Sequence, residues 1–412
     1  MNTPIQTRRG SVFATAEKLR ITFVTETYPP DINGVAHTTS KVVEGLLAKG
    51  HELTLVRPRQ HNNETPARRG RFQELLVRGI PIPMYQQLRM GFPAGGELRR
   101  LWRAARPDIV HIATEGPLGW SALRAARSLQ IPVSTDFRTN FHAYSRFYGI
   151  GWLKGAIESY MRKFHNDADC TMVPTQQLKR ELAGMAFDRL SVVPRGVDTK
   201  IFSPYQNSAE LRKSWGAAPD TVVILSVGRL AAEKNLAAVV RCYNSLRGAQ
   251  VRVKLVIVGD GPLRRQLQID CPDAVFAGFQ TGRSLAEHYA SADMFIFPSL
   301  TETFGNVTLE AMASGLAVVA YDHAAAHELI RNQKNGLAVS PGREDLLLAG
   351  ALQVAGDITL RNSMRLRARQ AALAQGWDAI VERTEAVFRA AILRTGETHE
   401  VQETGLYQSP AP

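Results

Sequence analysis

The sequence predicts an α/β protein built from two doubly wound domains that face each other across a cleft. Short apolar segments alternate with helix-length amphipathic segments along most of the 412 residues, and most of these segments are near-continuous runs of Val, Ile, Leu and Phe. Strands buried on both faces have this composition, which indicates parallel sheets covered by helices. A chain of this length is also longer than the chains that usually fold around a single hydrophobic core.

Eleven segments are predicted as strands, and they divide the chain into two similar halves. They are residues 21–26, 52–58, 108–114, 131–137, 170–174, 190–196, 221–228, 253–261, 273–279, 294–299 and 316–322. We expect an N-terminal Rossmann-like domain over 18–197 and a C-terminal one over 218–375, joined by the polar stretch 196–218. A last helix, 376–395, is expected to pack back toward the N-terminal domain.

Composition limits the class of protein. Apolar residues make up 44% of the chain, and no apolar run is long enough to span a bilayer. The N-terminal stretch around Arg8 and Arg9 lacks the apolar centre of a signal peptide, and Cys170, Cys242 and Cys271 lack metal-ligand spacing. A reduced, cytoplasmic setting is therefore expected.

The net charge of +12 is concentrated in one segment. Residues 66–106 carry nine arginines against Glu74 and Glu97, with apolar and aromatic side chains interleaved. Such a segment suits the anionic surface of a membrane, since no nucleic-acid-binding motif accompanies it. The alternative is an arginine-rich face that only contacts water.

Ligands of parallel sheets bind beyond the carboxyl ends of the strands, so the loops there are the candidate site. In the loop 25–39, Gly34 opens a helix whose free amides favour an anion, although a plain Asn-Gly turn has the same sequence. In 228–235, GRLAAEKN, Arg229 and Lys234 suit a diphosphate, or else pair with Glu233 or face water.

Two further loops follow strands of the second half. In 259–267, GDGPLRRQL, Gly259 leaves backbone bare for a nucleotide or forms only a tight turn. In 300–315, LTETFGNVTLEAMASG, Glu302 lies on the loop and Glu310 in the first turns of a helix. A carboxylate can accept two hydrogen bonds from a vicinal diol such as that of a ribose. The alternative is that Glu310 caps or pairs locally.

No metal site is expected. Asp167 and Asp169 form a DxD pattern, but its position between a helix and a strand favours a structural turn. Neither an HExxH motif, nor a Walker loop, nor a GxSxG motif occurs.

The order and spacing of these loops resemble the family 4 retaining glycosyltransferases, which have the GT-B architecture. The resemblance runs from about residue 20 to 390 and depends on NGV, GRLAAEK, GDGP and ETFGNVTLE, which matches the E-x7-E motif of that family. It implies that Arg229 and Lys234 neutralise the leaving diphosphate and that Glu302 holds hydroxyls of the donor sugar. The donor-binding set that it implies is Gly34, Gly259, Phe304, Gly305, Asn306 and Glu310.

The acceptor side departs from the family pattern. Many relatives have a histidine in an FHTNF-like stretch, where this chain has FRTNF and therefore Arg138. Arginine cannot act as a general base, so we expect it to bind a phosphate, an acidic sugar or a lipid headgroup. The acceptor-side candidates are Arg138, His142, His111 and Glu115.

The resemblance implies retention of the anomeric configuration with no metal or cofactor. The expected reaction moves a hexose from a UDP- or GDP-linked sugar to a hydroxyl, with a membrane lipid such as diacylglycerol as the leading acceptor and the inner face of the cytoplasmic membrane as the location. The alternatives are a soluble or polysaccharide acceptor, a nucleotide-sugar epimerase, a glycosyl phosphorylase, and a non-catalytic nucleotide-sugar-binding or membrane-adaptor protein.

Overall fold

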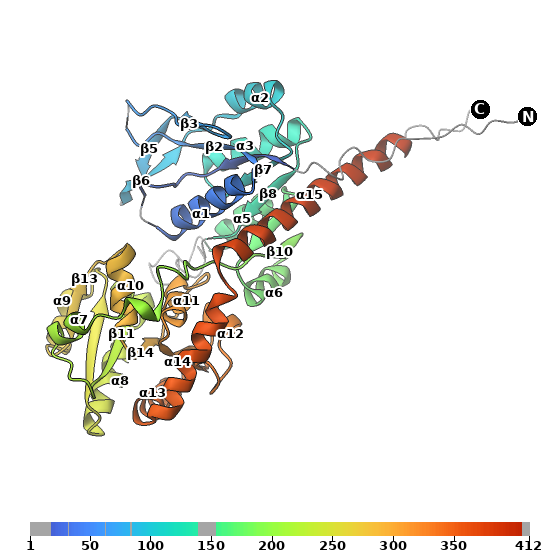
Figure 1. Ribbon diagram of the computed structural model, residues 1–412. Helices are drawn as coiled ribbons and strands as arrows, with labels where there is room; N and C mark the ends of the chain where they lie inside the picture. The colour runs from blue at the N-terminus through green and yellow to red at the C-terminus, as the bar shows by residue number, and fades with distance from the viewer. Residues whose placement is uncertain (1–17, 32, 62, 83–84, 139–153, 406–412) are drawn as a thin grey trace, which may run out of the picture.

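A computed structural model describes residues 18–31, 33–61, 63–82, 85–138 and 154–405, without the side chains of 82–88, 154 and 397–405. Its two lobes each contain one large sheet, and a long helix, α15 (Trp377–Gly405), runs from the second lobe along the first (Figure 1). Each of the eleven predicted segments contains a strand. The predicted two-domain α/β architecture is confirmed.

The first sheet has eight strands and is parallel except at one edge. Its order is β10 (Leu190–Val192), β9 (Cys170–Val173), β8 (Val133–Asp136), β7 (Ile109–Ile112), β1 (Arg20–Val24), β2 (Glu52–Pro58), β4 (Phe72–Val77) and β3 (Arg68–Arg69). The helices of this lobe are α1 (Gly34–Ala48), α2 (Gly95–Ala104), α3 (Pro117–Ser128), α5 (Lys154–Asn166) and α6 (Gln176–Gly184). In β1, Ile21 and Phe23 enter one buried cluster and Val24 another, because both faces of the sheet are covered.

The second sheet has six parallel strands. Its order is β13 (Val275–Gly278), β12 (Val253–Val258), β11 (Val222–Val227), β14 (Met294–Phe297), β15 (Ala317–Tyr321) and β16 (Leu337–Val339). The helices are α7 (Ala209–Ser214), α8 (Leu236–Gly248), α9 (Arg264–Asp270), α10 (Gly282–Ala290), α11 (Asn306–Ala313), α12 (Ala325–Leu329), α13 (Glu344–Gly356) and α14 (Ile358–Leu373), with 3₁₀ turns η2 (Pro204–Gln206) and η3 (Ala232–Lys234).

The two crossings between the lobes lie side by side. Val197 forms a bridge with Gly376, and its amide donates to the carbonyl of Gln375 at 3.0 Å. Beyond this point α15 returns to the first lobe, where Val381 packs against Gly45 of α1 and Phe388 joins the cluster under β1. The two segments that connect the lobes, at Val197 and at Gly376, therefore lie next to each other beside the gap between the sheets.

The segment 66–106 is folded differently from the amphipathic surface that its sequence suggests. It forms β3, β4, a two-stranded ribbon of β5 (Gly79–Ile82) and β6 (Tyr85–Gly91), and α2. Leu76, Leu98 and Trp102 lie in the core, while Ile80 and Phe92 are exposed. Most of the arginines are on the outside, so the segment does form a basic surface, but few of its apolar side chains are exposed there.

Candidate functional site

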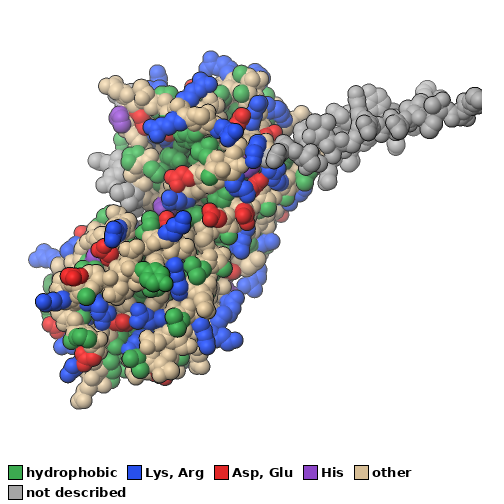
Figure 2. Space-filling model, viewed as in Figure 1, with side chains coloured by type: hydrophobic (Ala, Val, Ile, Leu, Met, Phe, Trp, Pro, Cys, Tyr) green, Lys and Arg blue, Asp and Glu red, His purple; other side chains and the backbone are tan. Residues whose placement is uncertain are grey.

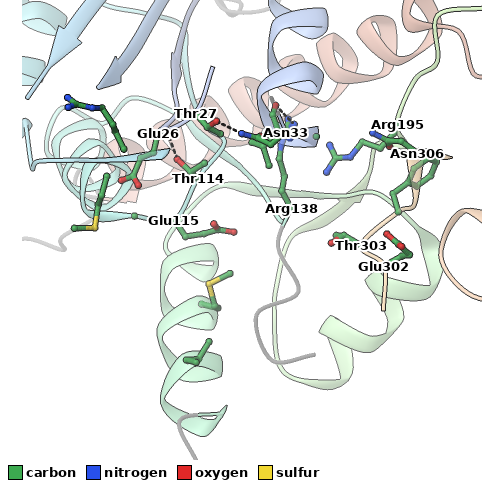
Figure 3. Close-up of a pocket in the computed structure, with 18 of the residues that line it drawn as sticks. Glu26, Thr27, Asn33, Thr114, Glu115, Arg138, Arg195, Glu302, Thr303 and Asn306 are labelled. Carbon is green, nitrogen blue, oxygen red and sulfur yellow. Dashed lines mark hydrogen bonds between the residues drawn. The ribbon is translucent and has the colours of Figure 1, made fainter. Parts of the chain in front are cut away.

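A cavity of about 1080 Å³ lies between the carboxyl ends of the two sheets (Figure 3). Loops that follow β1, β7, β8 and β10 form one wall, and the loop between β14 and α11 forms the other. This is the position that the parallel sheets predict for a ligand. The lining residues come from 26–35, 89–90, 114–117, 138, 157–161, 195 and 302–306.

The second-domain wall is centred on Glu302. The Nζ of Lys234 lies 2.5 Å from Glu302 Oε1, and Ser299 Oγ donates to the same oxygen at 2.8 Å. Lys234 ends the turn η3 directly after β11, whereas Glu302 follows β14, so neighbouring strands bring the two together. The carboxylate is held in place before any ligand arrives.

Helix α11 begins at the edge of the cavity. Its N-cap is Gly305, whose φ of 84° is in the left-handed region that glycine tolerates. Phe304 is buried beneath the loop, and Asn306 is the first residue of the helix. The first amides of α11 have no carbonyl partner within the helix, which favours an anion at this end.

The start of α1 lies opposite the start of α11. Asn33 caps α1 by accepting from the amides of Val35 and Ala36 at 3.0 and 2.9 Å. A Cβ on Gly34 would lie 3.9 Å from Asn306 Nδ2, so the start of α1 lies close to the side chain of Asn306 in the second domain. Two helix N-termini therefore face one space, as a diphosphate requires.

Four predicted residues lie on the same edge of the second sheet but outside the cavity lining, and one of them is Lys234, which contacts Glu302. Arg229, after β11, is exposed. Gly259, after β12, has a φ of 131° and leaves no room for a Cβ, which would overlap the carbonyl oxygen of Gly228. Glu310 accepts from the hydroxyl of Tyr289 at 3.0 Å, and burial raises the pKa of its carboxyl to about 7.

The first-domain wall contains a buried group of charges. Asp136, at the end of β8, accepts a hydrogen bond from Arg138 Nε at 2.6 Å, and His111 Nε2 lies 3.5 Å from the same carboxylate. Burial alone would raise the pKa of Asp136, but Arg138, His111 and Arg195 hold it well below its usual range. His111 lies within the core between Phe23 and Phe388 and does not line the cavity. His142 lies outside the described residues.

A pair of acids occupies the same wall. Glu26 accepts from the amide of Leu118 at 3.2 Å, and burial, with some help from Glu115, raises its pKa to about 7. Glu115 lies 3.5 Å from His165, and its Oε1 has no hydrogen-bond partner among the described residues. Both residues line the same cavity as two apolar residues of α5, Ile157 and Met161.

Sequence reasoning did not single out Glu26 or Arg195 as site residues. Each lies at the end of a predicted strand segment, in ITFVTE and LSVVPRG, and the strands themselves end earlier, at Val24 and Val192. The rule that ligands lie beyond carboxyl ends of strands could have identified both.

The DxD pattern has a structural role. The carboxylate of Asp169 accepts from the amide of Val133 at 2.8 Å, and Asp167 pairs with Arg127 at 3.1 Å. These contacts join α5 and β9 to neighbouring elements. Within the described ranges, no group of three or more His, Cys, Asp or Glu side chains is placed to hold a metal ion.

Two family models match the chain. One, described as "Glycosyltransferase Family 4", covers residues 32–201, and the other, "Glycosyl transferases group 1", covers 221–357. A "GDP-mannose-dependent alpha-mannosyltransferase" of Mycobacterium tuberculosis is 35% identical over 88% of this chain and 94% of the relative. The chain belongs to glycosyltransferase family 4. It is a glycosyltransferase that uses nucleotide sugars.

Further similarities agree in fold. An "Alpha-monoglucosyldiacylglycerol synthase" of Streptococcus pneumoniae is 28% identical over 81% of this chain and 77% of the relative. The structure of sucrose-phosphate synthase from Thermosynechococcus elongatus superposes with a TM-score of 0.74, at 17% identity, covering 92% of this chain and 100% of that one. The fold is GT-B. Among the described helices, none combines the length and the apolar character that crossing a membrane would need.

Proposed function

We propose that this glycosyltransferase moves mannose from GDP-mannose to a hydroxyl of a diacylglycerol-based lipid, with retention, without a metal, and at the inner face of the cytoplasmic membrane. The donor assignment is supported by the 35% identity to a GDP-mannose-dependent enzyme over nearly the whole chain. Because the mannose of GDP-mannose is α-linked, an α-mannoside product means retention.

On the donor side, different residues bind different parts of the nucleotide sugar. Arg229 and Lys234 neutralise the diphosphate, while the helix N-termini at Gly34 and Gly305 offer it backbone amides. Glu302 accepts from hydroxyls of the mannose, and Glu310 accepts from the ribose diol. The pairing of Lys234 with Glu302 at 2.5 Å puts the cation for the leaving group and the carboxylate for the sugar in one cluster.

The chemical step needs little covalent participation from the protein. The bond between the anomeric carbon and the diphosphate oxygen breaks, and the acceptor oxygen bonds to the same face of that carbon. The acceptor proton passes to the departing diphosphate oxygen. Cations positioned before the reaction stabilise the charge that develops, which removes the need for a metal ion.

The observation that carries the lipid assignment is the composition of the first-domain wall. Met90, Ile157 and Met161 line it next to the carboxylates of Glu26 and Glu115. Carboxylates suit hydroxyls of a glycerol or sugar headgroup, and the apolar side chains suit the beginning of an acyl chain. The relative named alpha-monoglucosyldiacylglycerol synthase supports the same class, because its name describes a glycosylated diacylglycerol as the product.

The basic face supports membrane contact. Seven of the nine arginines between 66 and 106 are exposed, and Figure 2 shows basic side chains on the surface of the first lobe as well as on the second. Phe92 and Ile80 are exposed on the same segment. Positive side chains near an anionic bilayer contribute about 1 kcal/mol each.

The test is incorporation of radiolabelled mannose into short-chain diacylglycerol lipids in the presence of EDTA, with GDP-mannose and UDP-glucose compared. We expect mannolipid from GDP-mannose, with the one-bond C1–H1 coupling of an α-mannoside by NMR, and none from Glu302→Gln. Glu287→Gln, on the exposed surface of α10, is the control and should remain active. Preferential use of UDP-glucose, or transfer only to water-soluble acceptors, would reject the donor or the acceptor assignment respectively.

A further inference from the structure

Arg195 is a buried cation that faces the cavity. It follows β10, is 8% exposed, and lines the first-domain wall. It makes neither a hydrogen bond nor an ion pair with any residue that the structure describes, and burial together with Arg138 lowers its pKa to about 10. A guanidinium removed from water is unfavourable unless a counter-charge meets it.

The neighbouring acid, Asp136, supplies only part of that counter-charge. Asp136 is occupied by Arg138, which contacts it through Nε and Nη2. Burial lowers the pKa of His111, so its imidazole is neutral near pH 7 and adds no charge. Two guanidinium groups thus face one carboxylate, and this corner of the cavity has an excess of positive charge.

Helix α1 adds to the same field. Arg138 Nη1 lies 3.4 Å from the carbonyl of Val35, which places the arginine at the first turn of this 15-residue helix. In Figure 3, Arg138 and Arg195 lie between Asn33 on one side and Glu302 on the other. The positive end of a helix and two arginines form an arrangement that binds carboxylates and phosphates.

The location favours the acceptor over the donor as the source of the anion. The first domain contributes to the donor only at the start of α1, at Gly34, whereas Arg138 and Arg195 lie on the wall that holds Glu26 and Glu115. The diphosphate already has Arg229 and Lys234 on the second domain, in the role proposed above. A second anion is needed to match the remaining charge.

We infer that Arg195, supported by Arg138, binds an anionic group, a carboxylate or a phosphate, carried by the lipid acceptor. This deepens the proposed function, because it restricts the acceptor to acidic lipids. An acceptor of this kind has its charge at Arg195, its reacting hydroxyl beneath the donor sugar and its chain along Ile157 and Met161.

The experiment measures binding without turnover. Calorimetric titration of the GDP-saturated protein compares three short-chain probes: dihexanoylglycerol, dihexanoyl phosphatidic acid and the hemisuccinate of dihexanoylglycerol. We expect at least one anionic probe to bind about tenfold or more tightly than the neutral one, as a charge-assisted hydrogen bond predicts. The preferred probe distinguishes a phosphate site from a carboxylate site.

Variants identify the residue. Arg195→Gln, and Arg195→Met, which keeps the aliphatic volume, should both lose the preference while their GDP affinity stays within about twofold of the wild type. Arg252→Gln, in an exposed pair with Asp220, is the matched loss of one charge and should keep the preference. The inference is overturned if the neutral probe binds equally well, or if the Arg195 variants lose GDP affinity and keep the preference.

The outcome is separable from that of the proposed function. A preference that depends on Arg195 in a protein that transfers no mannose would support the anion site and reject the donor assignment. Mannose transfer to neutral diacylglycerol at a rate that Arg195 variants leave unchanged would support the proposed function and reject the anion site.

Discussion

The two walls of the cavity are built on different principles. On the second domain, Glu302, Ser299 and Lys234 satisfy one another, and the loop shape depends on glycines at positive φ. On the first domain, neither Glu115 Oε1 nor the Arg195 guanidinium makes a hydrogen bond with a described residue, although His165 lies 3.5 Å from Glu115, and burial raises the pKa of Glu26. The comparison indicates that the polar groups of the second-domain wall, the donor wall, have their partners before a ligand binds. Those of the first-domain wall, the acceptor wall, gain partners only when the ligand binds.

The largest expected effect is on kcat, when Lys234 of the donor wall is replaced. Lys234→Met removes the cation from Glu302 and from the diphosphate, so kcat should fall by about 10²–10³-fold, the usual loss for one transition-state partner. Steady-state kinetics with GDP-mannose measures this.

The matched control for Lys234 is Arg343→Gln, in an exposed pair with Asp345 on the same domain. It should leave kcat unchanged. A Lys234→Met enzyme with normal kcat would show that the ion pair with Glu302 is only structural.

The second effect tests the backbone of the donor wall. Gly259→Ala would force a Cβ into the carbonyl of Gly228, whereas Gly282→Ala meets open space at a φ of 55°. The second variant should lose about 1 kcal/mol of unfolding free energy from backbone strain alone, and the first roughly 3 kcal/mol or more. Urea unfolding of both variants measures the difference; equal losses would mean that the two loops do not pack closely.

The third effect is smaller and depends on pH. Burial raises the pKa of Glu310 from 4.5 to about 7, so its contribution to stability is present below pH 4.5 and lost as the pH rises through 7. Glu310→Gln should therefore be more stable than the wild type at pH 8, by on the order of 2 kcal/mol, and equal to it near pH 4.5. Thermal unfolding at the two pH values measures this.

The same carboxyl affects binding in the opposite direction. Only its ionised form accepts both ribose hydroxyls, so GDP should bind more weakly below pH 7, and Glu310→Gln should lose this dependence. Glu344→Gln is the control, because Arg241 lowers the pKa of Glu344. A variant that is less stable than the wild type at pH 8 would contradict the burial of Glu310.

The donor wall was largely predictable from the sequence because its residues are local in the chain. Glu302, Phe304, Gly305 and Asn306 come from one loop, and Lys234 follows the neighbouring strand. The acceptor wall brings together Glu26, Thr114, Arg138 and Arg195, which are far apart in the sequence and share no motif. Only the sheet order places their loops together.

The missed strands have a similar explanation. β3 has two residues, β16 has three, and β4 to β6 lie in a segment rich in arginine, so none shows the long apolar run of a central strand. Some of the interleaved apolar residues of that segment, such as Leu76, Leu98 and Trp102, are buried in the core, which a count of its charges cannot reveal. Composition alone predicted the basic face.

The central claim is that the acceptor binds to the first-domain wall and that the nucleotide binds to the second-domain wall, with Gly34 as its contact in the first domain. Hydrogen exchange with GDP alone, and then with an anionic short-chain lipid added, tests this claim most directly. We predict that GDP protects amides within 228–235 and 302–311 and leaves those within 114–120 and 157–165 unchanged, and that the lipid then protects the latter. Protection of 114–120 by GDP alone, or of 302–311 by the lipid alone, would contradict the division of the cavity between its two walls.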